Sequence, residues 1–110
     1  MIEMQSNEQL NQYIDSLFTN ATADVYFHTN RMDLIGVPID LSKLNIIAKP
    51  SVIPVGVKSG KQMTDKIEMF EYVVNDKGSY IYSLDGANFI YEDADGESFI
   101  EMFKLNYYGL

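Results

Sequence analysis

The sequence predicts a two-layer α+β domain, in which an antiparallel, mainly meandering sheet of roughly four to six strands carries an N-terminal amphipathic helix and a short C-terminal helix. Three observations predict this fold class: helical periodicity near the N-terminus, two tight-turn signals in the second half, and a helix-start signal near the C-terminus. The chain has 110 residues, of which 46% are hydrophobic, so we expect residues 1–110 to form a single domain.

The first predicted element is a helix from about Ser6 to Thr19. Ser6 and Gln9 have the spacing of a capping box, in which each side chain satisfies a free amide of the first turn. Apolar side chains follow at helical spacing, at Leu10, Tyr13, Ile14, Leu17 and Phe18. The run of residues 24–29 that comes next is typical of a strand.

The middle of the chain holds two β-branched and apolar segments, residues 34–39 and 44–57, which prolines interrupt. Because proline has no amide hydrogen for a ladder, we expect these segments at edges, bulges or strand ends. Their strand order is left open. Residues 58–66 carry three lysines among polar residues, which is typical of an exposed loop.

Two turn signals set the register of the second half. The sequence of residues 75–78, Asn-Asp-Lys-Gly, favours a type I turn closed by a left-handed glycine, which pairs Tyr72 with Tyr82. Asp85-Gly86 favours a two-residue turn that pairs Tyr82 with Phe89. This register gathers six aromatic residues on one face of the sheet, namely Phe70, Tyr72, Tyr80, Tyr82, Phe89 and Tyr91. We expect most of them in the core, with Tyr80 and Tyr91 the most exposed.

Ser98 and Glu101 again have capping-box spacing and are predicted to begin the short C-terminal helix. Between Asp85 and Phe103 the chain has six acidic residues and no basic one. This acidic zone favours a docking surface for a basic protein partner. The candidate contact residues are Tyr80, Tyr91, Glu92, Asp93, Asp95 and Glu97.

The sequence predicts no catalytic residue, no metal site and no cofactor. We therefore expect that the protein is not an enzyme. The chain has no cysteine, which excludes thiol nucleophiles and thiolate metal sites. Its single histidine, His28, lies in a predicted strand, where a structural role is more common than a catalytic one. Residues 93–96 do not supply the ligand positions of a calcium loop. A paired-carboxylate hydrolase is conceivable, but no pair of acids stands out.

The net charge of −8 repels phosphate backbones and anionic membranes, so we expect no direct nucleic-acid binding and no membrane association. Acidity for solubility alone is the plainer interpretation. No apolar run approaches the ~20 residues of a membrane-spanning helix, and residues 1–6 do not have the pattern of a signal peptide. A cytoplasmic protein is therefore expected.

Several segments of the C-terminal half together resemble the SUKH superfamily. They are Ile53-Pro54-Val55-Gly56, the run from Gly78 to Asp85, Ile90-Tyr91 and the run from Glu97 to Phe103. The resemblance implies an α+β fold and the role of a bacterial immunity protein, which neutralises a toxin, often a nuclease, by binding it without catalysis.

The sequence thus favours a non-catalytic protein-binding domain of the immunity type, which neutralises a basic toxin or nuclease through an acidic surface. One alternative is a phage or mobile-element accessory protein that inhibits a host nucleic-acid enzyme by acidic mimicry. Another is a structural or assembly component of a larger particle. The identity of the partner and the oligomeric state are left open.

Overall fold

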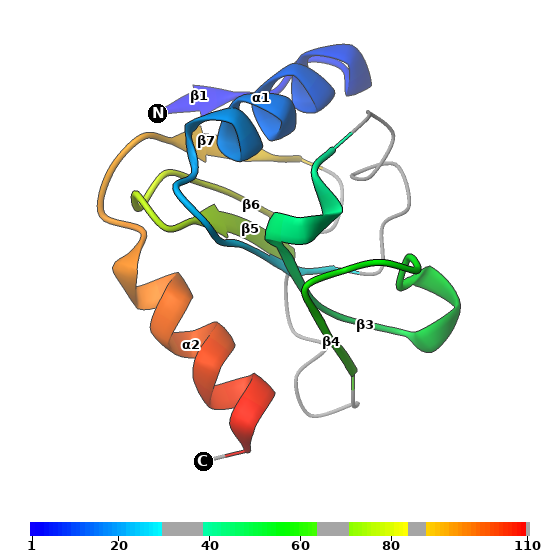
Figure 1. The fold of residues 1–110 in the computed structure, drawn as a ribbon. Coiled ribbons are helices and arrows are strands. Elements are labelled where there is room, and N and C mark those ends of the chain that lie inside the picture. Colours follow the sequence, from blue (N-terminus) through cyan, green and yellow to red (C-terminus); the bar gives the residue numbers. More distant parts are fainter. Residues whose placement is uncertain (30–38, 64–70, 84–87, 110) are drawn as a thin grey trace.

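The computed structural model describes residues 1–29, 39–63, 71–83 and 88–109. Within them the chain forms a seven-stranded mixed sheet, two α-helices and two single-turn 3₁₀ helices (Figure 1). The strands are β1 (Ile2–Glu3), β2 (Val25–His28), β3 (Leu44–Ala48), β4 (Ser59–Gln62), β5 (Glu71–Asn75), β6 (Tyr80–Ser83) and β7 (Ile90–Glu92). The helices are α1 (Asn7–Asn20), α2 (Glu97–Tyr108), and the short turns η2 (Leu41–Lys43) and η3 (Pro50–Val52).

The sheet has the strand order β1-β7-β6-β5-β2-β3-β4. The pairs from β1 to β2 are antiparallel, whereas β2, β3 and β4 run parallel to one another. The prediction of a smaller, antiparallel meander is therefore wrong, although the coarser α+β class is correct. Pro38 is outside the described residues. Pro50 lies in η3, just after β3 ends at Ala48, and Pro54 lies in the connection after η3. That crossover lets β4 return beside β3 in the parallel sense.

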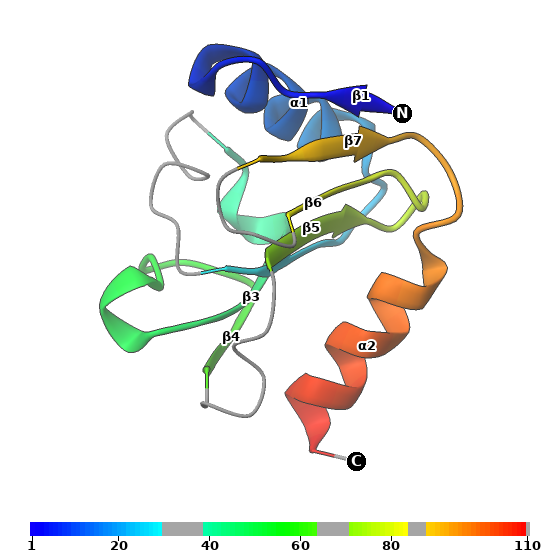
Figure 2. The ribbon, with the colours of Figure 1, turned by 180° about the vertical axis from the view of Figure 1, so that it is seen from behind.

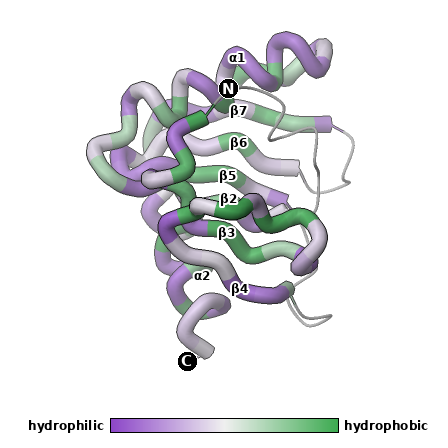
Figure 3. Tube along the Cα trace, turned by 45° about the vertical axis from the view of Figure 1, so that its right-hand side comes forward, coloured by the Kyte–Doolittle hydropathy of each residue, from purple (hydrophilic) through white to green (hydrophobic). Residues whose placement is uncertain are grey.

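Strand β4 forms one edge of the sheet in a segment predicted to be a loop. Its side chains alternate between half-buried and exposed, and the Met63 amide donates to the Ala48 carbonyl at 2.9 Å. An edge strand can consist of polar residues, as β4 does. A search for alternating apolar residues therefore does not detect it. Figure 3 shows this contrast between the hydrophilic β4 and the hydrophobic β2 and β3.

The two helices cover opposite faces of the sheet, which makes three layers rather than the two predicted (Figure 2). The face toward α1 buries Phe27, Ile46 and Val73, and the opposite face packs Tyr72 and Val74 against α2. Strand β3 is buried along its whole length. The central strands carry apolar side chains on both faces of the sheet, so each face must be covered by a helix.

The two hairpin registers had different outcomes. Tyr72 pairs with Tyr82, and the Asn75 amide donates to the Ser79 carbonyl at 3.0 Å, as the first turn signal predicts. Tyr82, however, pairs with Ile90 and not with Phe89, so the second register is displaced by one residue. Because side chains alternate along a strand, this displacement moves Phe89 and Tyr91 to the α1 face. The Asp85-Gly86 turn and Phe70 lie outside the described residues.

The helix starts also differ in how well the sequence predicts them. Helix α1 begins at the predicted cap, where Ser6 Oγ accepts from the Gln9 amide at 3.1 Å. Its buried residues are Leu10, Ile14, Leu17 and Phe18, which belong to the predicted stripe. Helix α2 begins at Glu97 with Gly96 as its N-cap, so the capping box predicted at Ser98 does not form. The helix continues to Tyr108, well beyond the predicted short helix, and ends at Gly109 with a φ of 72°.

Candidate functional site

Most of the predicted contact residues lie in the connection between β7 and α2, which we call the acidic turn (Glu92–Glu97). Asp93, Asp95 and Glu97 are exposed, and Glu92 is half-buried at the end of β7, opposite Tyr80 in the ladder. Asp95 has a φ of 71°, in the left-handed region that aspartate tolerates better than most residues. Three carboxylates therefore point into solvent from one short segment.

The acidic turn is fastened to the β5–β6 turn at two points. The Gly96 amide donates to the Gly78 carbonyl at 2.9 Å, and Ser79 Oγ donates to the Asp93 carbonyl at 3.2 Å. The two backbones approach so closely at Gly96 that a Cβ atom there would lie 2.5 Å from the Gly78 oxygen. The acidic turn is thus held through its own amide and carbonyl groups, and none of its side chains takes part in these two hydrogen bonds.

The structure places Tyr80 beside the acidic turn and Tyr91 away from it. Tyr80 packs on the α2 face, with its ring centroid 4.6 Å from that of Phe99. Desolvation raises the pKa of the Tyr80 phenol, and the charges of Glu92 and Asp95 raise it further. Tyr91 instead lies on the α1 face, 4.5 Å from the ring of Tyr13. The two candidate tyrosines therefore do not form one surface, because the register of β7 is displaced.

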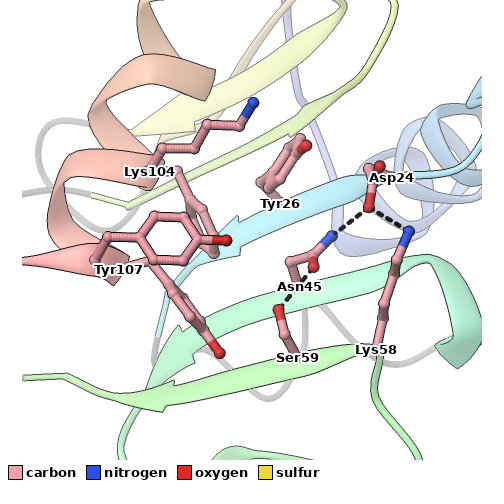
Figure 4. Close-up of a pocket in the computed structure, with 9 residues that line it drawn as sticks. Asp24, Tyr26, Asn45, Lys58, Ser59, Lys104 and Tyr107 are labelled. Atoms are coloured by element: carbon pink, nitrogen blue, oxygen red, sulfur yellow. Dashed lines mark hydrogen bonds and ion pairs between the residues drawn. The ribbon is translucent and has the colours of Figure 1, made fainter.

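A second feature lies at the opposite end of α2 and was missed by the sequence analysis. A cleft of about 290 Å³, which we call the aromatic cleft, opens between the C-terminal half of α2 and strands β2 to β4 (Figure 4). It is lined by Asp24, Tyr26, Asn45, Lys58, Ser59, Phe103, Lys104, Tyr107 and Tyr108. These residues come from four separate parts of the chain, so no local motif reveals the cleft.

A chain of hydrogen bonds forms the polar floor of the aromatic cleft (Figure 4). Ser59 Oγ donates to Asn45 Oδ1 at 2.7 Å, and Asn45 Nδ2 donates to Asp24 Oδ1 at 3.0 Å. The Lys58 ammonium pairs with the same Asp24 oxygen at 2.8 Å. Burial alone would raise the pKa of Asp24, but the hydrogen bonds from Lys58 and Asn45 outweigh it and hold the pKa below its usual value. Asp24 is therefore a stable anion at neutral pH.

The wall of the aromatic cleft is held in place by contacts between α2 and β4. Lys61 Nζ donates to the carbonyls of Asn106 and Tyr107 at 3.1 and 2.6 Å, and the Tyr107 hydroxyl donates to the Gly60 carbonyl at 3.2 Å. A cation on the last carbonyls of a helix satisfies acceptors that have no partner within the helix. Lys58 and Lys61, from the segment predicted to be a loop, thus have a structural function.

Lys104 differs from these lysines. It is exposed, lines the cleft, and forms no ion pair with the residues that the structure describes. Lys43, by contrast, caps the end of α1 through the carbonyls of Phe18 and Ala21, both at 3.0 Å. Lys104 is therefore available to bind an anion.

The described residues contain no group of three histidine or acidic side chains placed to hold a metal ion. His28 is buried, and its ring is stacked on that of Tyr72 with centroids 5.0 Å apart. Burial also raises the pKa of the Tyr72 phenol. Among the described helices none is both long and apolar enough to cross a membrane.

Comparison with solved structures shows a likeness in fold. No protein-family model matches the sequence, and no curated protein matches it. A chain of TrmBL2, described as an archaeal chromatin protein that shows a novel mode of DNA binding, has a similar fold, with a TM-score of 0.61 and 10% sequence identity. The match covers 97% of this chain and 48% of the TrmBL2 chain, so the chain spans about half the length of that protein.

This likeness corrects one prediction. The sequence predicts no direct nucleic-acid binding, on the basis of net charge alone. TrmBL2 has a similar fold and is described as binding DNA, so the prediction is corrected to this extent: the fold itself is compatible with DNA binding, and net charge alone does not exclude it. Net charge describes the average field of a molecule and does not describe a local surface such as the aromatic cleft.

Proposed function

We propose that this protein is a non-catalytic protein-binding domain and that the acidic turn is its contact surface. The type of protein that this surface suits best is an immunity protein, which neutralises a basic toxin or nuclease by covering its cationic surface. The observation that carries the proposal is the grouping of three exposed carboxylates, those of Asp93, Asp95 and Glu97, on a turn with a fixed backbone.

The physical argument is one of preorganisation. A charged surface that is already ordered loses little conformational entropy on binding, so more of the electrostatic attraction appears as affinity. The contact of Gly96 with the β5–β6 turn supplies that order. Tyr80 adds a half-buried aromatic ring next to the carboxylates, and tyrosine is frequent among residues that dominate binding energy.

Two related roles use the same surface. An inhibitor of a host nucleic-acid enzyme would bind through the acidic turn in place of DNA phosphates, and its binding would compete with nucleic acid. A structural component of a larger particle would associate with copies of itself or with other subunits. Competition with DNA and measurement of mass in solution distinguish these roles from the immunity type.

Direct contact with nucleic acid is a second candidate, favoured by the fold that the chain shares with TrmBL2 and by the exposed Lys104 at the aromatic cleft. It uses a different surface from the acidic turn. The two candidates are therefore separable by mutation.

The proposal is tested by neutralising the acidic turn in the triple variant Asp93→Asn, Asp95→Asn, Glu97→Gln. We expect a bound protein partner, captured from cell lysate at low salt, to lose about tenfold in affinity, because long-range attraction to a basic surface is removed. The binding is measured by titration of the captured partner at two salt concentrations.

The matched control is the triple variant Glu3→Gln, Glu8→Gln, Asp15→Asn. It also removes three exposed carboxylates, one of them from the first turn of a helix, but on the α1 side of the molecule. Equal losses in both variants would show that net charge alone drives the binding. No loss in the acidic-turn variant would overturn the assignment of this surface.

A further inference from the structure

We infer that the aromatic cleft is a binding site for a nucleoside phosphate, with the base against the tyrosine rings and the phosphate toward Lys104. The ligand is either a free nucleotide or the terminal nucleotide of a single strand. This inference goes beyond the proposed function, because it concerns the opposite end of α2 and a different class of ligand.

The walls of the cleft are suited to a flat ring. Tyr26 of β2 faces Phe103 of α2 with ring centroids 5.1 Å apart, and Tyr107 lies next along the helix, 5.8 Å from Phe103. Tyr108 continues this row, 5.2 Å from Tyr107, and its side chain is 70% exposed. An exposed aromatic ring at the mouth of a cleft offers a stacking surface, and base–aromatic stacking is tolerant of base identity.

The floor supplies hydrogen-bonding groups for the edge of a base. Both side-chain contacts of Asp24, with Asn45 and Lys58, use its Oδ1 atom, which leaves Oδ2 to accept from a ligand. The Ser59 hydroxyl donates to Asn45 and so retains its acceptor capacity. Base edges carry donors and acceptors side by side, and a carboxylate is a good acceptor for an exocyclic amino group.

Charge and size complete the match. Of the charged side chains that line the cleft, Lys58 is paired with Asp24, which leaves the Lys104 ammonium as the cation for a phosphate in a molecule whose net charge is −8. The volume of about 290 Å³ is at the lower end of the range of ligand pockets. That volume suits one nucleotide better than a folded partner or a long peptide.

The experiment is a titration of the isotope-labelled protein, followed by amide chemical shifts. The probes are AMP, GMP, CMP and UMP, with ribose 5-phosphate and inorganic phosphate as separate arms. We expect saturable shifts at Tyr26, Asn45, Ser59 and Tyr108, with dissociation constants in the millimolar range or below, and at least tenfold weaker binding of inorganic phosphate. A short single-stranded oligonucleotide distinguishes the two sources: tighter binding than the mononucleotide indicates a strand terminus, and equal binding indicates a free nucleotide.

Two pairs of variants test the assigned contacts. Tyr108→Ala removes the exposed ring and Lys104→Gln removes the cation, and each should weaken nucleotide binding about tenfold. Leu105→Ala, exposed on the same helix, and Lys77→Gln, exposed on the β5–β6 turn, should leave binding unchanged. The proposal is overturned if no probe saturates, if the shifts map to the acidic turn, if inorganic phosphate binds as tightly as the nucleotides, or if the control variants weaken binding equally.

Discussion

Gly96 occupies a position where no side chain fits, and this makes it the most sensitive residue of the acidic turn. A Cβ atom would lie 2.5 Å from the Gly78 oxygen and 2.9 Å from Tyr80 Cδ1. The first of these is a backbone atom, so the clash is relieved only if one of the two turns moves.

We expect Gly96→Ala to lower the free energy of unfolding by about 1–3 kcal/mol, the usual cost of forcing extra volume into a packed site. Ser98→Ala should be nearly neutral, because Ser98 is not the N-cap of α2 in the structure. Urea unfolding of both variants measures the difference. A costly Ser98→Ala with a silent Gly96→Ala would instead support the capping box that the sequence predicts.

Asp76 shows how a turn residue joins two parts of the chain. Its carboxylate accepts hydrogen bonds from the amides of Thr22, Ala23 and Asp24 at 2.9, 2.7 and 2.9 Å. Burial raises the pKa of Asp76, but these three donors outweigh it and place the pKa below its ordinary value. The sequence assigns this residue only to a turn, because its partners lie more than 50 residues away in the chain.

The sign of the pH effect follows from this lowered pKa. A carboxyl whose pKa is lower in the folded state stabilises the fold above its ordinary pKa, and this stabilisation is lost as the pH falls through the folded value. Wild-type protein should therefore lose stability below about pH 4, and Asp76→Asn should show a smaller loss over the same range. Melting temperatures between pH 2.5 and 7 measure it, with Asp15→Asn, exposed on α1, as the control. Identical slopes in wild type and Asp76→Asn would contradict this role.

At the scale of elements, the end of α2 depends on a strand that is distant in sequence. Lys61 of β4 donates to two of the last carbonyls of the helix. We expect Lys61→Gln to speed hydrogen exchange at amides 105–108 roughly fivefold, because about 1 kcal/mol of capping is lost. Lys58→Gln, which breaks the ion pair with Asp24, should leave those amides unchanged. Uniform acceleration in both variants would show that the lysines act only through global stability.

The elements that the sequence predicts well are those specified by neighbouring residues. The helix start at Ser6, the apolar stripe of α1 and the four-residue turn that begins at Asn75 are all local signals, and the structure has each of them. Of the predicted capping box only the Ser6 half forms, because Gln9 Oε1 accepts from the Gln5 amide. The parallel placement of β3 and β4 depends on a crossover, and the register of β7 depends on partners in β1 and β6. These are nonlocal contacts, which periodicity and turn chemistry do not encode.

The same reasoning explains which part of each site is predictable. The acidic turn is one continuous run, so its carboxylates are visible in the sequence. The wrong placement of Tyr91 follows from the displaced register of β7. The aromatic cleft combines residues as distant in the sequence as Tyr26 and Tyr108. They come together only because α2 packs across one face of the sheet.

At the scale of the whole molecule, the sheet is covered on both faces and its two sites lie at opposite ends of one helix. The α1 face holds the larger core cluster, and the α2 face holds a smaller and more aromatic one. Mutations in the α1 core should therefore act on both sites through global stability. Mutations of exposed residues along α2 should instead affect one site at a time.

The described charges are distributed unevenly along α2. Carboxylates gather at its N-terminus, and Lys61 and Lys104 lie toward its C-terminus. This arrangement of charges is opposite in sense to the intrinsic dipole of the helix. The field around α2 thus has opposite signs at the two ends of the helix. A charged partner that approaches α2 is therefore drawn to one end and repelled from the other. Cationic surfaces are drawn to the acidic turn, and anionic ones to Lys104 at the aromatic cleft.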